Sequence, residues 1–144
     1  MPITTNVKNT ILKGLVGHTN IFGSAVYVGL SSTDPADGVT EPVSGGYARV
    51  LVGAYNQGAT HKFGDPDGGA VVNNDFIYFP ESTDSWGVTL HYFVLFTAAT
   101  GGTVLGYGLL ESNGEATPIT VSAEKTVVMF RPETLVISIP DELE

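Results

Sequence analysis

Residues 86–110 read WGVTLHYFVLFTAATGGTVLGYGLL, from Trp86 to Leu110. In the first part of this stretch apolar side chains alternate with Gly87 and Thr89, which is the two-residue period of a strand with one buried face. From Phe93 to Phe96 the chain is apolar without a break. A strand that is apolar on both faces is covered on both sides, so we predict that this one lies centrally in a sheet.

The return half of the stretch predicts the partner strand of a β-hairpin. Residues 98–102 supply the glycines that a tight reversal needs, and residues 104–110 then form the second strand. Gly106 and Gly108 lie on one face of it, which lets a large neighbour such as Trp86 or Phe93 lie against the backbone. The aromatic residues expected in the core are Trp86, Phe93, Phe96 and Tyr107.

The first residues predict one amphipathic helix of about three turns, because apolar residues recur there at helical spacing. Thr4 or Thr5 is a suitable N-cap and Gly17 a suitable end. Gly14 weakens the helix by about 1 kcal/mol relative to Ala, so we expect the helix to depend on docking. It either closes one end of the domain or packs on a neighbouring subunit. The interface residues expected on it are Val7, Ile11, Leu12 and Leu15.

Short apolar strands separated by turns fill the rest of the chain, which contains 18 Gly and 8 Pro. The expected strands are Ala25–Leu30, Tyr47–Ala54, Asp75–Phe79, Trp86–Phe96, Val104–Leu110, Ile119–Val121, Thr126–Phe130 and Leu135–Ile139. The predicted fold class is all-β: an antiparallel jelly-roll-type β-sandwich of about eight short strands with one short N-terminal helix. We expect a helical arm at 1–24, the β-sandwich domain at 25–140 and a frayed acidic tail at 141–144.

Charge and composition exclude several classes of protein. The 144 residues carry 6 Lys and Arg against 15 Asp and Glu, a formal charge of −9, and the basic residues are scattered. Direct nucleic-acid binding and attraction to anionic membranes are therefore not expected. No Cys is present, which excludes disulfides and thiolate chemistry. The first residues lack the pattern of a signal peptide, and no apolar run approaches the ~18 residues of a spanning helix.

No catalytic constellation stands out in the sequence. The chain has no nucleophile elbow, no Walker loop and no dinucleotide fingerprint, so we expect no enzyme and no catalytic residue. His18, His61 and His91 lack metal-binding spacing, and we expect neither a cofactor nor a metal site. Ca²⁺ stays open as an alternative, because acidic residues share two loops: Asp34, Asp37 and Glu41 in the first, and Asp65 and Asp67 in the second.

Arg49 is the one charged residue within the apolar strand YARVLV. It is either a solubilising charge on an outward face, or it makes a salt bridge that anchors a loop or a subunit, with Glu41 or Asp34 as partner. Because of the second alternative, we include it among the expected interface residues.

From Ala25 onward the order of motifs resembles a family of small bacteriophage and prophage virion proteins, known as tail fiber or capsid decoration proteins. The residues that carry the resemblance are AVYVGLSSTDP (25–35), GGYARV (45–50), Phe79-Pro80, Trp86-Gly87, FVLF (93–96), ATGG (99–102) and LGYGLL (105–110). The short N-terminal helix and the apolar last strand, TLVISI, also fit. The longer loop at 56–73 and the segment ESNGEATP (111–118) differ from the family's pattern.

The resemblance implies a structural, non-enzymatic protein of the virion, made in the cytoplasm of the bacterial host. We expect it to decorate the capsid exterior as a cement protein, with a tail fiber or receptor-binding tail component as the alternative. A carbohydrate-binding β-sandwich module is the alternative of another class. The expected partners are further copies of the chain, three as the first expectation, and the major capsid protein or a tail protein.

Overall fold

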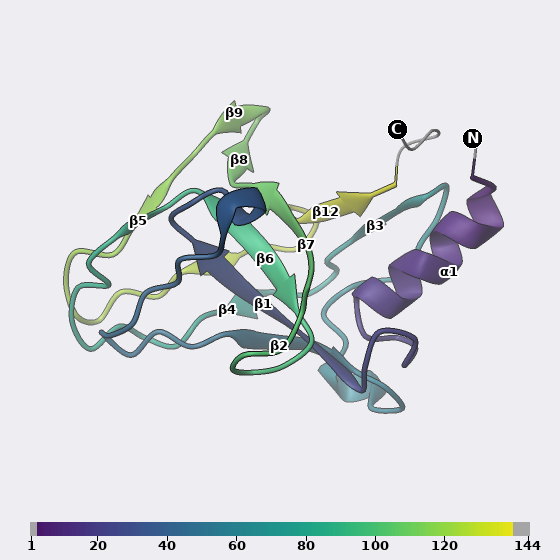
Figure 1. Cartoon of the computed structure of the whole chain (residues 1–144), viewed down its shortest axis with the longest axis horizontal. Coiled ribbons are helices and arrows are strands. Elements are labelled where there is room, and N and C mark those ends of the chain that lie inside the picture. Colours follow the sequence, from purple (N-terminus) through teal and green to yellow (C-terminus); the bar gives the residue numbers. More distant parts are fainter. Residues whose placement is uncertain (1–2, 140–144) are drawn as a thin grey trace. The chain divides into compact units, whose positions relative to one another are not determined.

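The computed structural model describes residues 3–139, which contain one α-helix, two short 3₁₀ helices and twelve short β-strands (Figure 1). The paired strands run antiparallel. This confirms the predicted all-β, sandwich-like class with one short N-terminal helix. The predicted frayed tail at 141–144 lies outside the described residues.

The chain divides into two compact units. The first unit comprises Met1–Val26, Leu51–Ile77 and Met129–Glu144, and the second comprises Tyr27–Val50 and Tyr78–Val128. The division into an arm at 1–24 and a domain at 25–140 stays a prediction.

The first unit holds α1 (Thr5–Leu15), most of β2 (Val50–Ala54), η2 (Gly58–Thr60), β3 (Ala70–Val72), β11 (Met129–Phe130) and β12 (Val136–Ser138). The second holds most of β1 (Ala25–Ser31), η1 (Pro35–Asp37), β5 (Thr89–Leu90), β6 (Tyr92–Phe96), β7 (Val104–Leu109), β8 (Glu111–Ser112), β9 (Glu115–Ala116) and β10 (Ile119–Thr120). β4 (Ile77–Tyr78) lies at the boundary.

The predicted hairpin forms the centre of the second unit. β6 lies between β1 and β7 and pairs with both, so its predicted central position is confirmed (Figure 1). Val94, Leu95 and Phe96 are buried, as expected of a strand covered on both faces. Loops of the second unit begin and end at strands of this sheet, as residues 97–103 do between β6 and β7.

Three features raise the strand number above the predicted eight. The stretch from Trp86 to Phe96 is two strands, because Leu90 of β5 pairs with β10 whereas β6 pairs with β1 and β7. β3 adds a strand within a segment expected to be loop. β8 and β9 add a hairpin around Asn113 and Gly114, whose φ angles of 54° and 79° are typical of a two-residue type I′ turn.

Glycine allows one close contact in the hairpin, as predicted. Gly108 lies opposite Phe93, and a Cβ placed on Gly108 would lie 2.5 Å from the Phe93 ring. Trp86 does not take this place; it is buried elsewhere, with its indole Nε1 donating a hydrogen bond to the Gly45 carbonyl at 3.1 Å. Gly106 has open space where a Cβ would be.

The expected core residues differ in burial. Trp86 and Phe96 are buried, and Phe93 is half-buried. Tyr107 is 49% exposed, so the expectation of a core position is wrong for this residue. It lies on β7, the last strand in the order of its sheet, and contacts Tyr92 edge to face. A side chain on an edge strand has a neighbouring strand on one side only, so more of it meets solvent.

The ends of α1 follow the predicted capping. Thr4 is the N-cap, and its Oγ1 accepts a hydrogen bond from Val7 N at 3.4 Å. At the other end His18 N donates to Lys13 O at 2.8 Å and Gly17 N to Gly14 O at 3.3 Å, with Gly17 at φ 81°. These are the two hydrogen bonds of a Schellman motif, for which glycine is the usual residue because φ is positive.

α1 packs against β3 within the first unit (Figure 1). The buried side of the helix carries Leu12 and, just beyond its end, Val16. Ile11 and Leu15 are half-buried and Val7 is 49% exposed. Gly14 has a packing role in addition to its expected cost, since a Cβ there would lie 2.4 Å from Ile21 Cγ1.

Asn73 connects three segments of the first unit through its fully buried side chain. Its Nδ2 donates to Asp75 O at 3.0 Å and to Arg131 O at 2.8 Å. Its Oδ1 accepts from Thr134 N at 3.1 Å and from Leu135 N at 2.8 Å. All hydrogen-bonding positions of the amide are therefore used, and the turn at 131–135 depends on them.

We predict that Asn73→Ala lowers the free energy of unfolding by about 2–4 kcal/mol, because it leaves the buried N–H of Leu135 and three partly buried backbone groups without their partner. Urea denaturation measures the loss. Asn74→Ala is the matched control, since Asn74 is exposed, and it should change stability by less than about 0.5 kcal/mol. Equal losses for the two variants would contradict this role of Asn73.

Candidate functional site

Arg49 lies at the centre of a polar cluster in the second unit, just before β2 begins. Its side chain is only 8% exposed, and the guanidinium carbon lies 3.4 Å from the centre of the Phe96 ring. A guanidinium stacked on an aromatic face keeps favourable electrostatics while it loses water. Arg49 is therefore part of the interior, and the predicted alternative of an outward solubilising charge is wrong.

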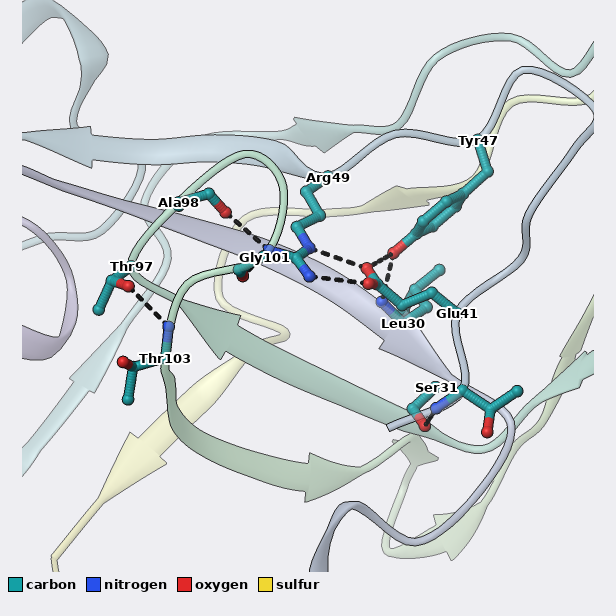
Figure 2. Close-up of polar contacts among 10 residues, drawn as sticks. Leu30, Ser31, Glu41, Tyr47, Arg49, Thr97, Ala98, Gly101 and Thr103 are labelled. Carbon is teal, nitrogen blue, oxygen red and sulfur yellow. Dashed lines mark hydrogen bonds and ion pairs between the residues drawn. The ribbon is translucent and has the colours of Figure 1, made fainter. Parts of the chain in front are cut away.

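Glu41 is the ionic partner of Arg49. Arg49 Nε donates to Glu41 Oε1 at 3.0 Å, and Nη2 donates to Glu41 Oε2 at 2.8 Å (Figure 2). This two-bond geometry is the strongest that an Arg and a carboxylate form. It confirms the alternative of a salt bridge to Glu41. Asp34, the other predicted partner, instead caps η1 by accepting from Ala36 N at 3.0 Å.

The second terminal nitrogen of Arg49 holds a loop. Nη1 donates to Ala98 O and to Gly101 O, both at 2.8 Å (Figure 2). The same loop is closed at its base, where Thr103 N donates to Thr97 Oγ1 at 2.9 Å. The loop-anchoring role predicted for Arg49 is confirmed. We call Arg49, Glu41 and loop 97–103 the Arg49 clamp.

Tyr47 extends the Arg49 clamp to strand β1. Its hydroxyl donates to Glu41 Oε1 at 2.7 Å and accepts from Leu30 N at 2.9 Å. Burial, followed by the hydrogen bond to Glu41, raises the pKa of Tyr47 far above its usual value, so the phenol stays protonated. Gly29 makes room, because a Cβ there would lie 2.8 Å from Glu41 Oε1, Tyr47 Oη and Phe96.

Sequence reasoning identified Arg49 and Glu41 but missed Tyr47 and Gly29. A signal was present: Tyr47 and Arg49 are two residues apart, which places them on one face of an extended segment. The role of Gly29 had no such signal, because it depends on how near three side chains come to the backbone.

A shallow hollow of about 260 Å³ lies beside the Arg49 clamp. It is lined by Glu41, Pro42, Tyr47, Ala48, Arg49, Ala99, Thr100 and Gly101. Its volume is slightly below the usual range for small-molecule pockets, and its charged groups are already paired with each other. The paired charges leave Glu41 and Arg49 bonded within the protein, and Arg49 fixes loop 97–103 beside the hollow.

Three carboxylates of the predicted acidic loops lie next to polar or charged groups of the protein. Asp34 caps η1, Glu41 pairs with Arg49, and Asp65 lies 3.6 Å from His18. Among residues 3–139 no group of three or more His, Asp or Glu side chains is placed to hold a metal ion. Within the same range no helix has the length and hydropathy to cross a membrane.

The helix residues predicted as an interface are placed together on α1. Leu12 faces inward, whereas Val7, Ile11 and Leu15 are at least partly accessible. A contact of these residues, or of Arg49, with another subunit stays a prediction. For Arg49 four N–H groups already have partners within the second unit.

A comparison with protein families gives a match over most of the chain. Residues 2–126 match the family model of podophage GP4 fiber I protein gp80. The chain belongs to this family. Membership supports the predicted class, a structural protein of the bacteriophage virion, and favours the tail-fiber alternative over capsid decoration. No curated protein matches the chain.

We predict that Arg49→Lys lowers the free energy of unfolding by about 1–3 kcal/mol, because one ammonium cannot replace the planar fork that bonds Glu41 and two carbonyls. The Thr103 amide, which is bonded within loop 97–103, should also exchange its hydrogen faster. Denaturation and amide exchange measure the two effects.

Arg131→Lys is the matched control, since Arg131 is exposed, and it should change stability by less than about 0.5 kcal/mol. An Arg49→Lys protein as stable as wild type, with unchanged exchange at Thr103, would contradict the clamp.

Proposed function

We propose that this chain is a structural component of the tail fiber of a tailed bacteriophage. The family match over residues 2–126 carries the proposal. Capsid decoration and a carbohydrate-binding module lack comparable support. The proposed partners are further copies of the chain and a tail protein, and the proposed location is the virion.

The structure of the second unit supports a role in presenting a surface. Four hydrogen bonds from Arg49 hold residues 97–103 and Glu41 in fixed positions beside the β1–β6–β7 sheet. Val43, two residues from Glu41, is 98% exposed. Loops that are rigid and exposed bind a partner at low entropic cost, which is what a fiber subunit needs at its contacts.

The surface proposed for self-association is the accessible side of α1 and the residues after it. Val7 is 49%, Ile21 54% and Phe22 37% exposed. Exposed apolar side chains in one segment are a common mark of a protein contact.

Charge favours a second copy of the chain as the occupant of this surface. Residues 1–24 carry Lys8 and Lys13 but no acidic residue, whereas the whole chain has a formal charge of −9. The remaining residues are therefore strongly acidic, and the exposed Lys13 of the helix is complementary to that surface on a neighbouring copy, whereas Lys8 is only 4% exposed. A homo-oligomer, with three copies as the first expectation, would form through this contact.

The fiber assignment predicts where the protein is found among phage particles. Two preparations of particles should be purified: intact particles of the wild-type phage, and DNA-filled heads from a phage mutant that makes no tails. We expect this chain in the intact particles and expect it to be missing from the tailless heads, as measured by quantitative mass spectrometry. Equal amounts per head in the two preparations would contradict the fiber assignment and favour decoration.

The self-association surface predicts the effect of a charge reversal on α1. Lys13→Glu should weaken the oligomer at low salt, because it removes the attraction between the helix and the acidic surface of the next copy. Sedimentation equilibrium measures the association constant. Arg131→Glu makes the same change in net charge outside α1 and should leave association close to that of wild type. If the two variants associate equally, the helix surface is not the contact.

A further inference from the structure

Two histidines far apart in sequence are stacked in the first unit. The ring centroids of His18 and His61 lie 4.3 Å apart, with an angle of 19° between the planes. His18 follows the C-terminal end of α1 and His61 follows η2. The stack therefore joins the end of the helix to the segment between β2 and β3.

The hydrogen bonds of the two rings determine which nitrogen carries the proton. His18 Nε2 lies 3.0 Å from Phe63 O, and His61 Nε2 lies 3.1 Å from Ala54 O. A carbonyl oxygen only accepts hydrogen bonds, so each Nε2 must be the donor. In the neutral rings the basic nitrogen is Nδ1, and a second proton on either ring binds there.

The surroundings of His18 disfavour a second proton. Burial is the largest cause and the neighbouring His61 the next, and together they lower the pKa of His18 below its usual value of 6.5. Lys13 of α1 acts in the same direction. Asp65 opposes them, with its Oδ1 3.6 Å from His18 Nδ1, but its side chain is 90% exposed and water weakens the attraction.

The sign of the pH effect follows from this lowered pKa. The unfolded chain takes up the His18 proton at a higher pH than the folded chain does, so the contribution of His18 to stability is complete above about pH 6.5. It is lost as the pH falls through the pKa of the folded state. A proton on each ring would also place two positive charges in rings whose centroids lie 4.3 Å apart.

The C-terminal end of α1, next to His18, lies in close contact with β2. Gly17, next to His18, lies so close to β2 that a Cβ on it would be 2.4 Å from Gly53 O. A Cβ on Gly53 would likewise meet the carbonyl of Val16. The helix end and β2 therefore touch backbone to backbone, directly next to His18.

We propose that the His18–His61 stack is a proton-operated latch, which fastens the C-terminal end of α1 to the segment 54–63 while both rings are neutral and releases it when both are protonated. The latch rests on the geometry of the first unit alone and does not depend on the fiber assignment. Its effect is local, because the Arg49 clamp and the hairpin of the second unit contain neither of these histidines.

Amide hydrogen exchange of the full chain, followed by NMR at about pH 7.5 and about pH 5, above and below the ordinary imidazole pKa of about 6.5, tests the latch. The reporters are the His18 amide, bonded to Lys13 O, and the His61 amide, bonded to Gly58 O. Their protection factors should fall about fivefold or more at the lower pH, as expected for two charges at this separation even in a water-like medium. The amides of β6 should show no comparable fall. Unchanged protection at the reporters would overturn the proposal.

His61→Gln separates charge from hydrogen bonding. The glutamine amide is able to donate to Ala54 O but does not take up a proton, so the pKa of His18 should rise and the difference between the two pH values should shrink to the part that the burial of His18 causes. His91→Gln is the matched control, because His91 lies in the second unit, and it should keep the wild-type difference. A His61→Gln protein with the full wild-type response would contradict the latch.

The wild-type protein also gives a test that needs no variant. Long-range nitrogen–proton NMR spectra at neutral pH should show both rings with the hydrogen on Nε2. A hydrogen on Nδ1 of either ring would overturn the hydrogen-bond arrangement on which the latch depends.

Discussion

The salt bridge between Arg49 and Glu41 is the interaction on which the second unit depends most. A guanidinium that is 8% exposed loses most of its hydration, and this loss is offset only when the charge is paired and its N–H groups have acceptors. The bridge joins residues 41–49 to loop 97–103, and Tyr47 continues it to the backbone of β1. One ionic contact thus connects two loops to the central sheet.

In the first unit a neutral side chain, the amide of Asn73, connects separate segments as the salt bridge does in the second. The buried amide of Asn73 bonds Asp75, Arg131 and the turn that leads to Leu135. Strands such as β3 and β12 have only three residues each, too few to define their surroundings by ladder hydrogen bonds alone. Buried polar side chains supply the missing connections, and each must be fully satisfied because an unpaired polar group in the interior is costly. Exposed loops that are fixed by such contacts suit a protein that assembles with others.

Local patterns were sufficient to predict the fold class, the hairpin and the helix ends. The uninterrupted apolar run at 93–96 marked β6 as central, and Gly17 marked the end of α1. Periodicity did not reveal that Tyr107 lies on an edge strand, because the pattern of one strand does not say whether another covers it. The salt bridge of Arg49 was one of two alternatives. The stack of His18 and His61 had no sequence signal, since the residues are 43 positions apart and meet only through tertiary packing.

We propose that the chain is a fiber protein of the virion and not a capsid protein. Family membership over residues 2–126 supports it. Immunogold labelling of intact phage particles with an antibody against this chain separates the two locations. We expect gold on the tail fibers and none over the heads. Gold distributed over the heads would contradict the proposal and identify a capsid decoration protein.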